Sequence, residues 1–181
     1  WLKKTRAWNV LSWIFLTIGI ILGGQWAYVE LGWGGYWAWD PIENASFIPW
    51  LVATAFIHTS IIQERSNIMK VWNMVLIVLT FVLCIFGTYL VSSGILQSVH
   101  DFGATGLGVY FLSFLVITLL GSVLLIAESY RDLKSHNTLE SLLARESTFL
   151  FNNVILLALA FATLFGTVFP LLSEAVTGNK M

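Results

Sequence analysis

Long apolar runs alternate with short polar connections along the whole chain. Four runs hold roughly 20 mostly apolar residues each, which is the length that a helix needs to cross a bilayer core of about 30 Å. They lie at about 8–28, 71–92, 107–129 and 149–172. A fifth run, at about 45–63, is shorter and contains Pro49. The pattern predicts an all-α fold, a polytopic transmembrane helix bundle with about five spans.

The composition agrees with a membrane protein. Of the 181 residues, 57% are hydrophobic and 10% are charged, which is far from the composition of a soluble domain. The net charge of −1 gives no indication of nucleic-acid binding, so we predict membrane lipid as a partner and no nucleic acid. Because the chain begins with Trp1 and stops soon after a span, we expect residues 1–181 to be a membrane-domain fragment of a larger protein.

The first apolar run is followed by no short cleavage site of small residues, so we interpret it as a span and not as a signal peptide. Basic residues then indicate the orientation of the bundle. Eight of the nine lie on one predicted side, and only Lys180 lies on the other. By the positive-inside rule, the side with eight faces the cytoplasm. The connections 29–44 and 93–106 would then face the periplasm of a bacterial inner membrane, or the equivalent side of a mitochondrial inner membrane.

Aromatic residues and glycines concentrate in the connection between the first two spans. Five of the nine tryptophans lie within residues 26–50. Tryptophans at the membrane interface often form a belt scattered over helix ends, but here the aromatic residues are packed into one connection among Gly32, Gly34 and Gly35. Glycine lets the backbone approach a ligand closely, and aromatic rings offer large rigid faces. The segment therefore favours binding of a flat apolar ligand such as haem, on Trp33, Tyr36, Trp37 and Trp39.

The run Asp40-Pro41-Ile42-Glu43 has the pattern of a helix start. Asp is a preferred N-cap, Pro suits the first helical position, and Glu three residues after the cap completes a capping box. The electropositive N-terminus of a helix would also favour an anionic group such as a haem propionate, so Asp40 counts among the candidate haem-site residues. Pro49 predicts a kink further along this helix.

The three histidines have different surroundings. His58 lies inside the second span, at four-residue spacing from Thr54 and Trp50, and an ionisable residue at membrane depth is by default a functional hypothesis. Imidazole is a normal ligand of haem iron, and the alternative is a neutral histidine bonded to a neighbouring helix. His100 lies in the outer connection 93–106, on the same side as the tryptophans. His136 lies in the inner connection 130–147, where we expect exposure to solvent.

Other catalytic and metal-binding patterns are missing from the sequence. The single Cys84 lies within a span, which excludes an internal disulfide and a Cys-x-x-Cys pair. No P-loop, dinucleotide fingerprint, nucleophile elbow or zinc spacing occurs. We therefore assign no catalytic residue.

The aromatic segment also carries a family resemblance. Residues 33–50 read WGGYWAWDPIENASFIPW and resemble the WWD signature of the haem-handling superfamily, in the form of its CcmF branch. The continuation DPIENASF distinguishes this form from the haem-exporting CcmC branch. Residues 92–100 and 171–180 support the resemblance, which covers nearly the whole chain. Tyr36 and Ala38 stand where many members carry Trp and Phe.

The resemblance implies a cytochrome c haem lyase, which forms thioether bonds between haem vinyl groups and the two thiols of a Cys-x-x-Cys-His apocytochrome c. It implies that His58 ligates a resident haem b and that His100 ligates the haem delivered by the chaperone CcmE. Segment 29–50 would bind that delivered haem. Further partners implied are CcmH- and CcmI-type thiol and apocytochrome-binding components. Two further histidine ligands of the family have no counterpart in this sequence.

Three alternatives stay open at this point. One is a non-catalytic haem exporter or haem-binding scaffold of the same superfamily. The second is the paralogous lyase that serves a nitrite-reductase cytochrome, and it would share these residues. The third is an electron-carrying membrane cytochrome b, which needs paired histidines within spans, whereas only His58 lies in one.

Overall fold

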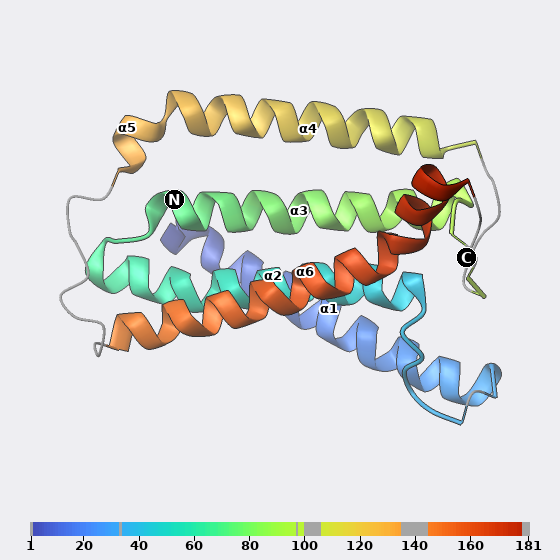
Figure 1. Cartoon of the computed structure of the whole chain (residues 1–181). Helices are drawn as coiled ribbons and strands as arrows, with labels where there is room; N and C mark the ends of the chain where they lie inside the picture. The colour runs from blue at the N-terminus through green and yellow to red at the C-terminus, as the bar shows by residue number, and fades with distance from the viewer. Residues whose placement is uncertain (1, 33, 97, 100–105, 135–144, 179–181) are drawn as a thin grey trace.

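The computed structural model describes residues 2–32, 34–96, 98–99, 106–134 and 145–178. These residues form five long helices and one short helix (Figure 1): α1 (Leu2–Glu30), α2 (Pro41–Ser66), α3 (Lys70–Ser93), α4 (Gly108–Glu128), α5 (Tyr130–Leu133) and α6 (Arg145–Thr177). All five long helices are long and apolar enough to cross a membrane, which confirms the predicted polytopic all-α fold. Four of the five long helices, all but α4, extend beyond the predicted runs because helical hydrogen bonding continues into the polar flanks, as at Lys3 and Lys4 of α1.

The long helices alternate in direction along the chain (Figure 1). The start of α1, the turn between α2 and α3, and α5 lie at one end, and the connection after α1 lies at the opposite end with the end of α6. The described basic side chains belong to the first of these ends: Lys3, Lys4, Arg6, Arg65, Lys70, Arg131 and Lys134. The structure thus gathers these charges as the sequence predicted, and we call this the basic end.

Helix α2 is the central helix of the fold. It packs against α1, α3 and α6, whereas α4 packs against α3 and α5. The core contains Leu51, Val52 and Phe56 of α2, with Leu76 of α3 and Ala160 of α6. Apolar residues of α1 and α4 are largely exposed. In the part of the chain that the structure describes, α2 is therefore surrounded by three helices, and α1 and α4 lie at the outside with much of their apolar surface exposed.

Helices α2 and α3 approach closely at Gly87. A Cβ atom at this position would lie 3.1 Å from the carbonyl oxygen of Ala45. Pro49 lacks an N–H group, so the carbonyl of Ala45 receives no hydrogen bond from the residue four positions ahead, and Gly87 leaves room for it. Helix α2 continues through Pro49, so the proline does not end the helix.

Buried polar side chains join the helices away from water. Asn73 of α3 is fully buried. Its Nδ2 donates to Gln63 Oε1 at 2.7 Å and to the Thr59 carbonyl at 3.2 Å, and its Oδ1 accepts from the Thr59 hydroxyl. An unsatisfied polar group in hydrocarbon costs several kcal/mol, so this complete pairing sets how α3 sits on α2.

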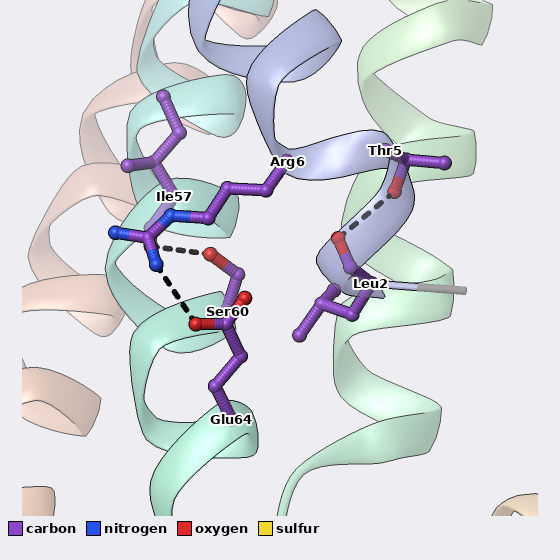
Figure 2. Close-up of polar contacts among 6 residues, drawn as sticks. All are labelled: Leu2, Thr5, Arg6, Ile57, Ser60 and Glu64. Atoms are coloured by element: carbon purple, nitrogen blue, oxygen red, sulfur yellow. Dashed lines mark hydrogen bonds and ion pairs between the residues drawn. The ribbon is translucent and has the colours of Figure 1, made fainter.

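At the basic end, an ion pair joins α1 to α2. Figure 2 shows the guanidinium of Arg6 reaching from α1 to the carboxylate of Glu64, at 2.8 Å. Ser60 beside them donates to the Ile57 carbonyl within α2. The pair marks the point where the first turns of α1 meet the last turns of α2.

Candidate functional site

The aromatic segment enters α2 through a complete capping box, as the sequence predicted. The Ile42 amide donates to Asp40 Oδ1 at 3.0 Å, and the Asp40 amide donates to Glu43 Oε2 at 3.2 Å. The Ala38 amide adds a third bond, to Glu43 Oε2 at 3.0 Å. These bonds satisfy backbone donors that the start of a helix would otherwise leave free. They fix the chain direction between Ala38 and the first turn of α2.

Trp39 has a left-handed backbone, with φ at +59°. This conformation is uncommon for a bulky residue and costs on the order of 1–3 kcal/mol. Asn44 holds it in place, because its Nδ2 donates to the Trp39 carbonyl at 3.0 Å and to Thr167 Oγ1 of α6 at 3.1 Å. The Trp39 side chain is 63% exposed. The strained backbone therefore directs an indole away from the core.

Ring contacts lead from Trp39 into the helix pair α1 and α2. Trp37 meets Trp39 edge-on at 6.0 Å between ring centroids and Phe47 at 5.6 Å. Phe47 stacks on Trp50 at 5.8 Å, and Trp50 stacks on Trp13 of α1 at 5.8 Å. The aromatic segment is thus the outer end of a longer aromatic row and is supported by it.

Tyr36 belongs to a different contact, because it stacks on Tyr28 of α1 at 4.6 Å. The backbone here lies close to α1, since a Cβ atom on Gly24 would be 2.7 Å from the Tyr36 carbonyl oxygen. Gly32 and Gly34 have φ of +64° and +70°. These two glycines therefore serve the left-handed turns of the connection, which is a structural reason for the glycines that the sequence interpretation connected with ligand approach.

A cavity of about 720 Å³ lies between the aromatic segment and α6. Trp39, Pro41 and Asn44 line one side of it, Ile95 and Leu96 contribute from the outer connection, and α6 contributes residues 159–174 in part. Its volume falls in the range of about 300–1,000 Å³ that small-molecule sites occupy. Asn44 is only 6% exposed, and its Oδ1 has no hydrogen-bond partner among the described residues.

The outer connection after α3 is tied to the aromatic segment. Ser98 Oγ donates to Asp40 Oδ1 at 2.7 Å. Asp40 therefore caps α2 and also binds the connection in which the sequence analysis placed a ligand. His100, Trp33 and His136 all lie outside the described residues. The predictions that concern them are therefore not tested by the structure.

His58 lies deep in α2, apart from the aromatic segment. With a rise of about 1.5 Å per residue, it is about 25 Å along the helix from Pro41. His58 is half-buried, and its Nδ1 lies 2.7 Å from Nδ2 of Asn152 on α6. The ring of Phe149, also on α6, meets it edge-on at 6.0 Å. The hydrogen bond to a neighbouring helix that the sequence analysis gave as the alternative is thus present, and it occupies one of the two ring nitrogens.

The four-residue spacing of Trp50, Thr54 and His58 does not put all three against one partner helix. Trp50 Nε1 donates to Thr17 Oγ1 of α1 at 2.8 Å, and Thr54 Oγ1 accepts from Trp13 Nε1 of α1 at 2.9 Å. His58 faces α6 instead. Four residues of an α-helix turn about 400°, which is about 40° more than one full turn. Over the two steps from Trp50 to His58 the side-chain direction therefore shifts by about 80°, from α1 toward α6.

The described residues contain no group of three or more His, Cys, Asp or Glu side chains that would hold a metal ion. Cys84 is a free, exposed cysteine within α3. The described residues therefore offer two candidate sites. The outer place is the aromatic segment with its cavity, and the deeper place is His58 with its neighbours on α6.

Residues 1–97 match the family model described as cytochrome C assembly protein. The chain belongs to the cytochrome c assembly protein family. It is 47% identical over 173 residues to the cytochrome c-type biogenesis protein CcmF of Escherichia coli K12, which covers 95% of this chain and 27% of that protein. It is 37% identical over 181 residues to the cytochrome c-type biogenesis protein NrfE of Haemophilus influenzae, covering 99% of this chain and 28% of that protein.

A solved structure, described as cytochrome c heme lyase CcmF, is also similar to this member of the cytochrome c assembly protein family. The two structures superpose with a TM-score of 0.77 at 36% sequence identity. The match covers 96% of this chain and 26% of the solved chain. The chain thus spans about a quarter of the length of the relatives it matches. The agreement in fold extends over nearly all of this chain.

Sequence reasoning missed three residues of the two places described above. Asn44 and Asn152 are polar residues inside apolar helices, and Gly24 marks the close approach of the connection to α1. The signal for the asparagines was available, because a polar residue at membrane depth is costly and usually has a partner. Nothing in the sequence indicates which helix supplies that partner.

Proposed function

We propose that the full protein containing this chain is a haem lyase of the bacterial inner membrane that matures c-type cytochromes. The observation that carries the proposal is Trp39, whose exposed indole lines a cavity of about 720 Å³ beside the connection tethered by Ser98. Membership of the cytochrome c assembly family supports the same class of function. The aromatic segment then faces the periplasm, and the basic end faces the cytoplasm.

The outer place suits haem as a substrate. A porphyrin is a flat apolar disc, and Trp37 and Trp39 offer ring faces and edges held by Phe47. Asn44 Oδ1 is a buried acceptor at the cavity wall that no described residue hydrogen-bonds. We propose that Trp33, Tyr36, Trp37 and Trp39 form the binding platform and that His100 ligates the delivered haem iron. Asp40 would act by holding platform and connection together.

The deeper place suits a resident haem b. His58 has one ring nitrogen engaged by Asn152 and the other, Nε2, without a hydrogen bond to a described side chain in that arrangement. An imidazole held through one nitrogen is the usual state of a metal-ligating histidine. When bound there, haem b supplies one-electron redox chemistry. We propose that His58 is one axial ligand and that the second comes from the part of the protein outside this chain.

The contribution of these residues to thioether formation is orientation. A vinyl carbon and a thiol must come to about 3–3.5 Å in a defined geometry before they react. A platform with a fixed face, together with an iron ligand in the tethered connection, sets which vinyl group meets which cysteine. Both thiols come from the Cys-x-x-Cys-His apocytochrome c, since the only cysteine of this chain, Cys84, lies in the apolar part of α3.

The proposed partners follow from this reaction. They are the haem chaperone CcmE, which delivers the haem, CcmH- and CcmI-type thiol and apocytochrome-binding components, and the apocytochrome itself. The chain is more similar to the E. coli CcmF protein, at 47% identity, than to the NrfE protein, at 37%. This difference favours a protein of the CcmF type over one of the NrfE type.

The test uses the full-length protein, purified with its haem. His58→Ala should abolish the b-type Soret band, because it removes an iron ligand. Trp39→Ala and His100→Ala should keep that band and lose transfer from haem-loaded chaperone to apocytochrome, measured as covalent haem on a gel. Trp8→Ala is the matched control, since Trp8 is 70% exposed near the basic end of α1.

An unchanged Soret band in His58→Ala would remove His58 as a ligand. Normal covalent haem yield in both Trp39→Ala and His100→Ala would contradict the outer site. Haem uptake at the aromatic segment without any covalent product, with all lyase partners present, would point to the haem-binding scaffold instead.

A further inference from the structure

We propose that Asn152 is a positioning residue for His58: its side-chain oxygen accepts a hydrogen bond from Nδ1–H and so directs Nε2 toward the haem iron. This inference rests on the proposed function of His58. Its geometric basis is the 2.7 Å separation between His58 Nδ1 and the amide end of Asn152. That distance is typical of a hydrogen bond involving a side-chain amide.

The chemistry of imidazole determines which way the amide must turn. A neutral imidazole has one nitrogen that donates and one that accepts, and only the unprotonated nitrogen can ligate a metal. If Nε2 binds iron, Nδ1 carries the proton and needs an acceptor. Asn152 supplies an acceptor when its side-chain amide is rotated by 180°. This rotation puts Oδ1 in the position of Nδ2, next to His58 Nδ1, and puts Nδ2 in the position of Oδ1.

The residue after Asn152, Asn153, fixes this part of α6 to the core. Asn153 is fully buried. Its Nδ2 donates to the Ala55 carbonyl of α2 at 3.1 Å, and its Oδ1 accepts from Trp72 Nε1 of α3 at 3.2 Å. Ala55 precedes His58 by three residues, so this bond sets the register between α6 and the turn of α2 that carries the histidine.

One further contact reaches the imidazole itself, and another fixes the backbone beside it. The Phe149 ring lies edge-on to it at 6.0 Å. Thr59, the next residue along α2, bonds Asn73 of α3. The backbone that carries His58 is thus tied to α3, and its ring is bracketed by Phe149 and Asn152 of α6. These contacts position the ring and its backbone, as a preorganised ligand requires.

A hydrogen bond from His58 to Asn152 would change the redox chemistry of the haem, whereas simple packing of the two side chains would not. A hydrogen bond accepted from Nδ1–H makes the ligating nitrogen more basic and favours the ferric iron. Removing the acceptor should therefore raise the reduction potential of the haem b and weaken its retention. A stronger acceptor should lower the potential.

The test measures the reduction potential and haem content of the full-length holoprotein. Asn152→Leu, which lacks an acceptor, should raise the potential and lower haem affinity by about 10–100-fold. Asn152→Asp, which keeps an acceptor, should retain haem at a lower potential than the parent. Thr148→Ala is the control, because Thr148 is an exposed residue one turn earlier on α6, and it should change neither quantity.

Each outcome decides the inference. Haem loss in Asn152→Leu with retention and a lowered potential in Asn152→Asp supports it, even where the leucine variant folds poorly. Equal potentials in all three variants and the parent would overturn it, as would haem loss in Asn152→Asp. If His58→Ala keeps its b-type band, the proposed function of His58 fails first. If that band is lost and the Asn152 variants are unchanged, only the role of Asn152 fails.

Discussion

Asp40 and Asn44 each bond residues that lie far away in the sequence. Asp40 caps its own helix and also accepts from Ser98, and Asn44 joins the Trp39 carbonyl to Thr167. The capping box was predictable, because its partners are three residues apart and their spacing is set by helix geometry. The bonds to Ser98 and Thr167 were not predictable, because nothing local in a sequence records which distant residue will stand opposite.

The bond between Asp40 and Ser98 gives a prediction for single residues. Asp40→Ala should lower the melting temperature of the full-length protein, because an N-cap is worth about 0.5–2 kcal/mol and the connection also loses its tether. Ser98→Ala should lower it less, and the double variant should show less than the sum of both effects, since the two share one bond. Asp132→Ala, an exposed acidic residue in α5, is the control. Strict additivity of the two changes would contradict the tether.

At the scale of helices, hydrophobicity predicted how many spans there are and about where they lie. It did so because the thickness of the bilayer fixes the length of an apolar run. It missed α5, which is a single turn of Tyr130–Leu133 inside the predicted inner connection. The four-residue spacing of Trp50, Thr54 and His58 likewise did not indicate that Trp50 turns toward α1 and His58 toward α6.

The contact between α1 and the aromatic segment gives a prediction at this scale. Gly24→Ala should destabilise the protein and displace the aromatic segment, because its Cβ would lie 2.7 Å from the Tyr36 carbonyl oxygen. Gly23→Ala is a matched control, since a Cβ there meets nothing within 4 Å, and alanine has the better helix propensity. Gly24→Ala alone should therefore lower the unfolding temperature and the yield of holocytochrome. Equal behaviour of both variants would show that the segment does not rest on α1.

For the whole molecule, the sequence did not reveal which helices touch. In a membrane, both lipid-facing and helix-facing surfaces are apolar, so hydrophobicity carries little information about partners. Helix α4 is an example: it is apolar, yet within the described residues it packs against α3 and α5 and against no other helix. The apolar faces of α1 and α4 are what a piece spanning about a quarter of its relatives would show.

The orientation of the molecule can be tested with an impermeant thiol reagent. In full-length protein with Cys84→Ser, Val99→Cys should react in intact spheroplasts, because Val99 is 57% exposed beside the aromatic segment. Tyr130→Cys, at a site 52% exposed at the basic end, should react only after the membrane is permeabilised. The reverse pattern would place the aromatic segment on the cytoplasmic side and remove the proposed encounter with periplasmic apocytochrome.

A single continuous helix, α2, carries the tethered aromatic segment at its first residue and His58 further down. The helical rise therefore fixes the distance between the aromatic segment and His58. Inserting one residue between them would move His58 by about 1.5 Å and turn it by about 100° around the helix axis. Because no flexible connection intervenes, the number of residues in this stretch sets both the gap between the two places and the direction in which the imidazole points.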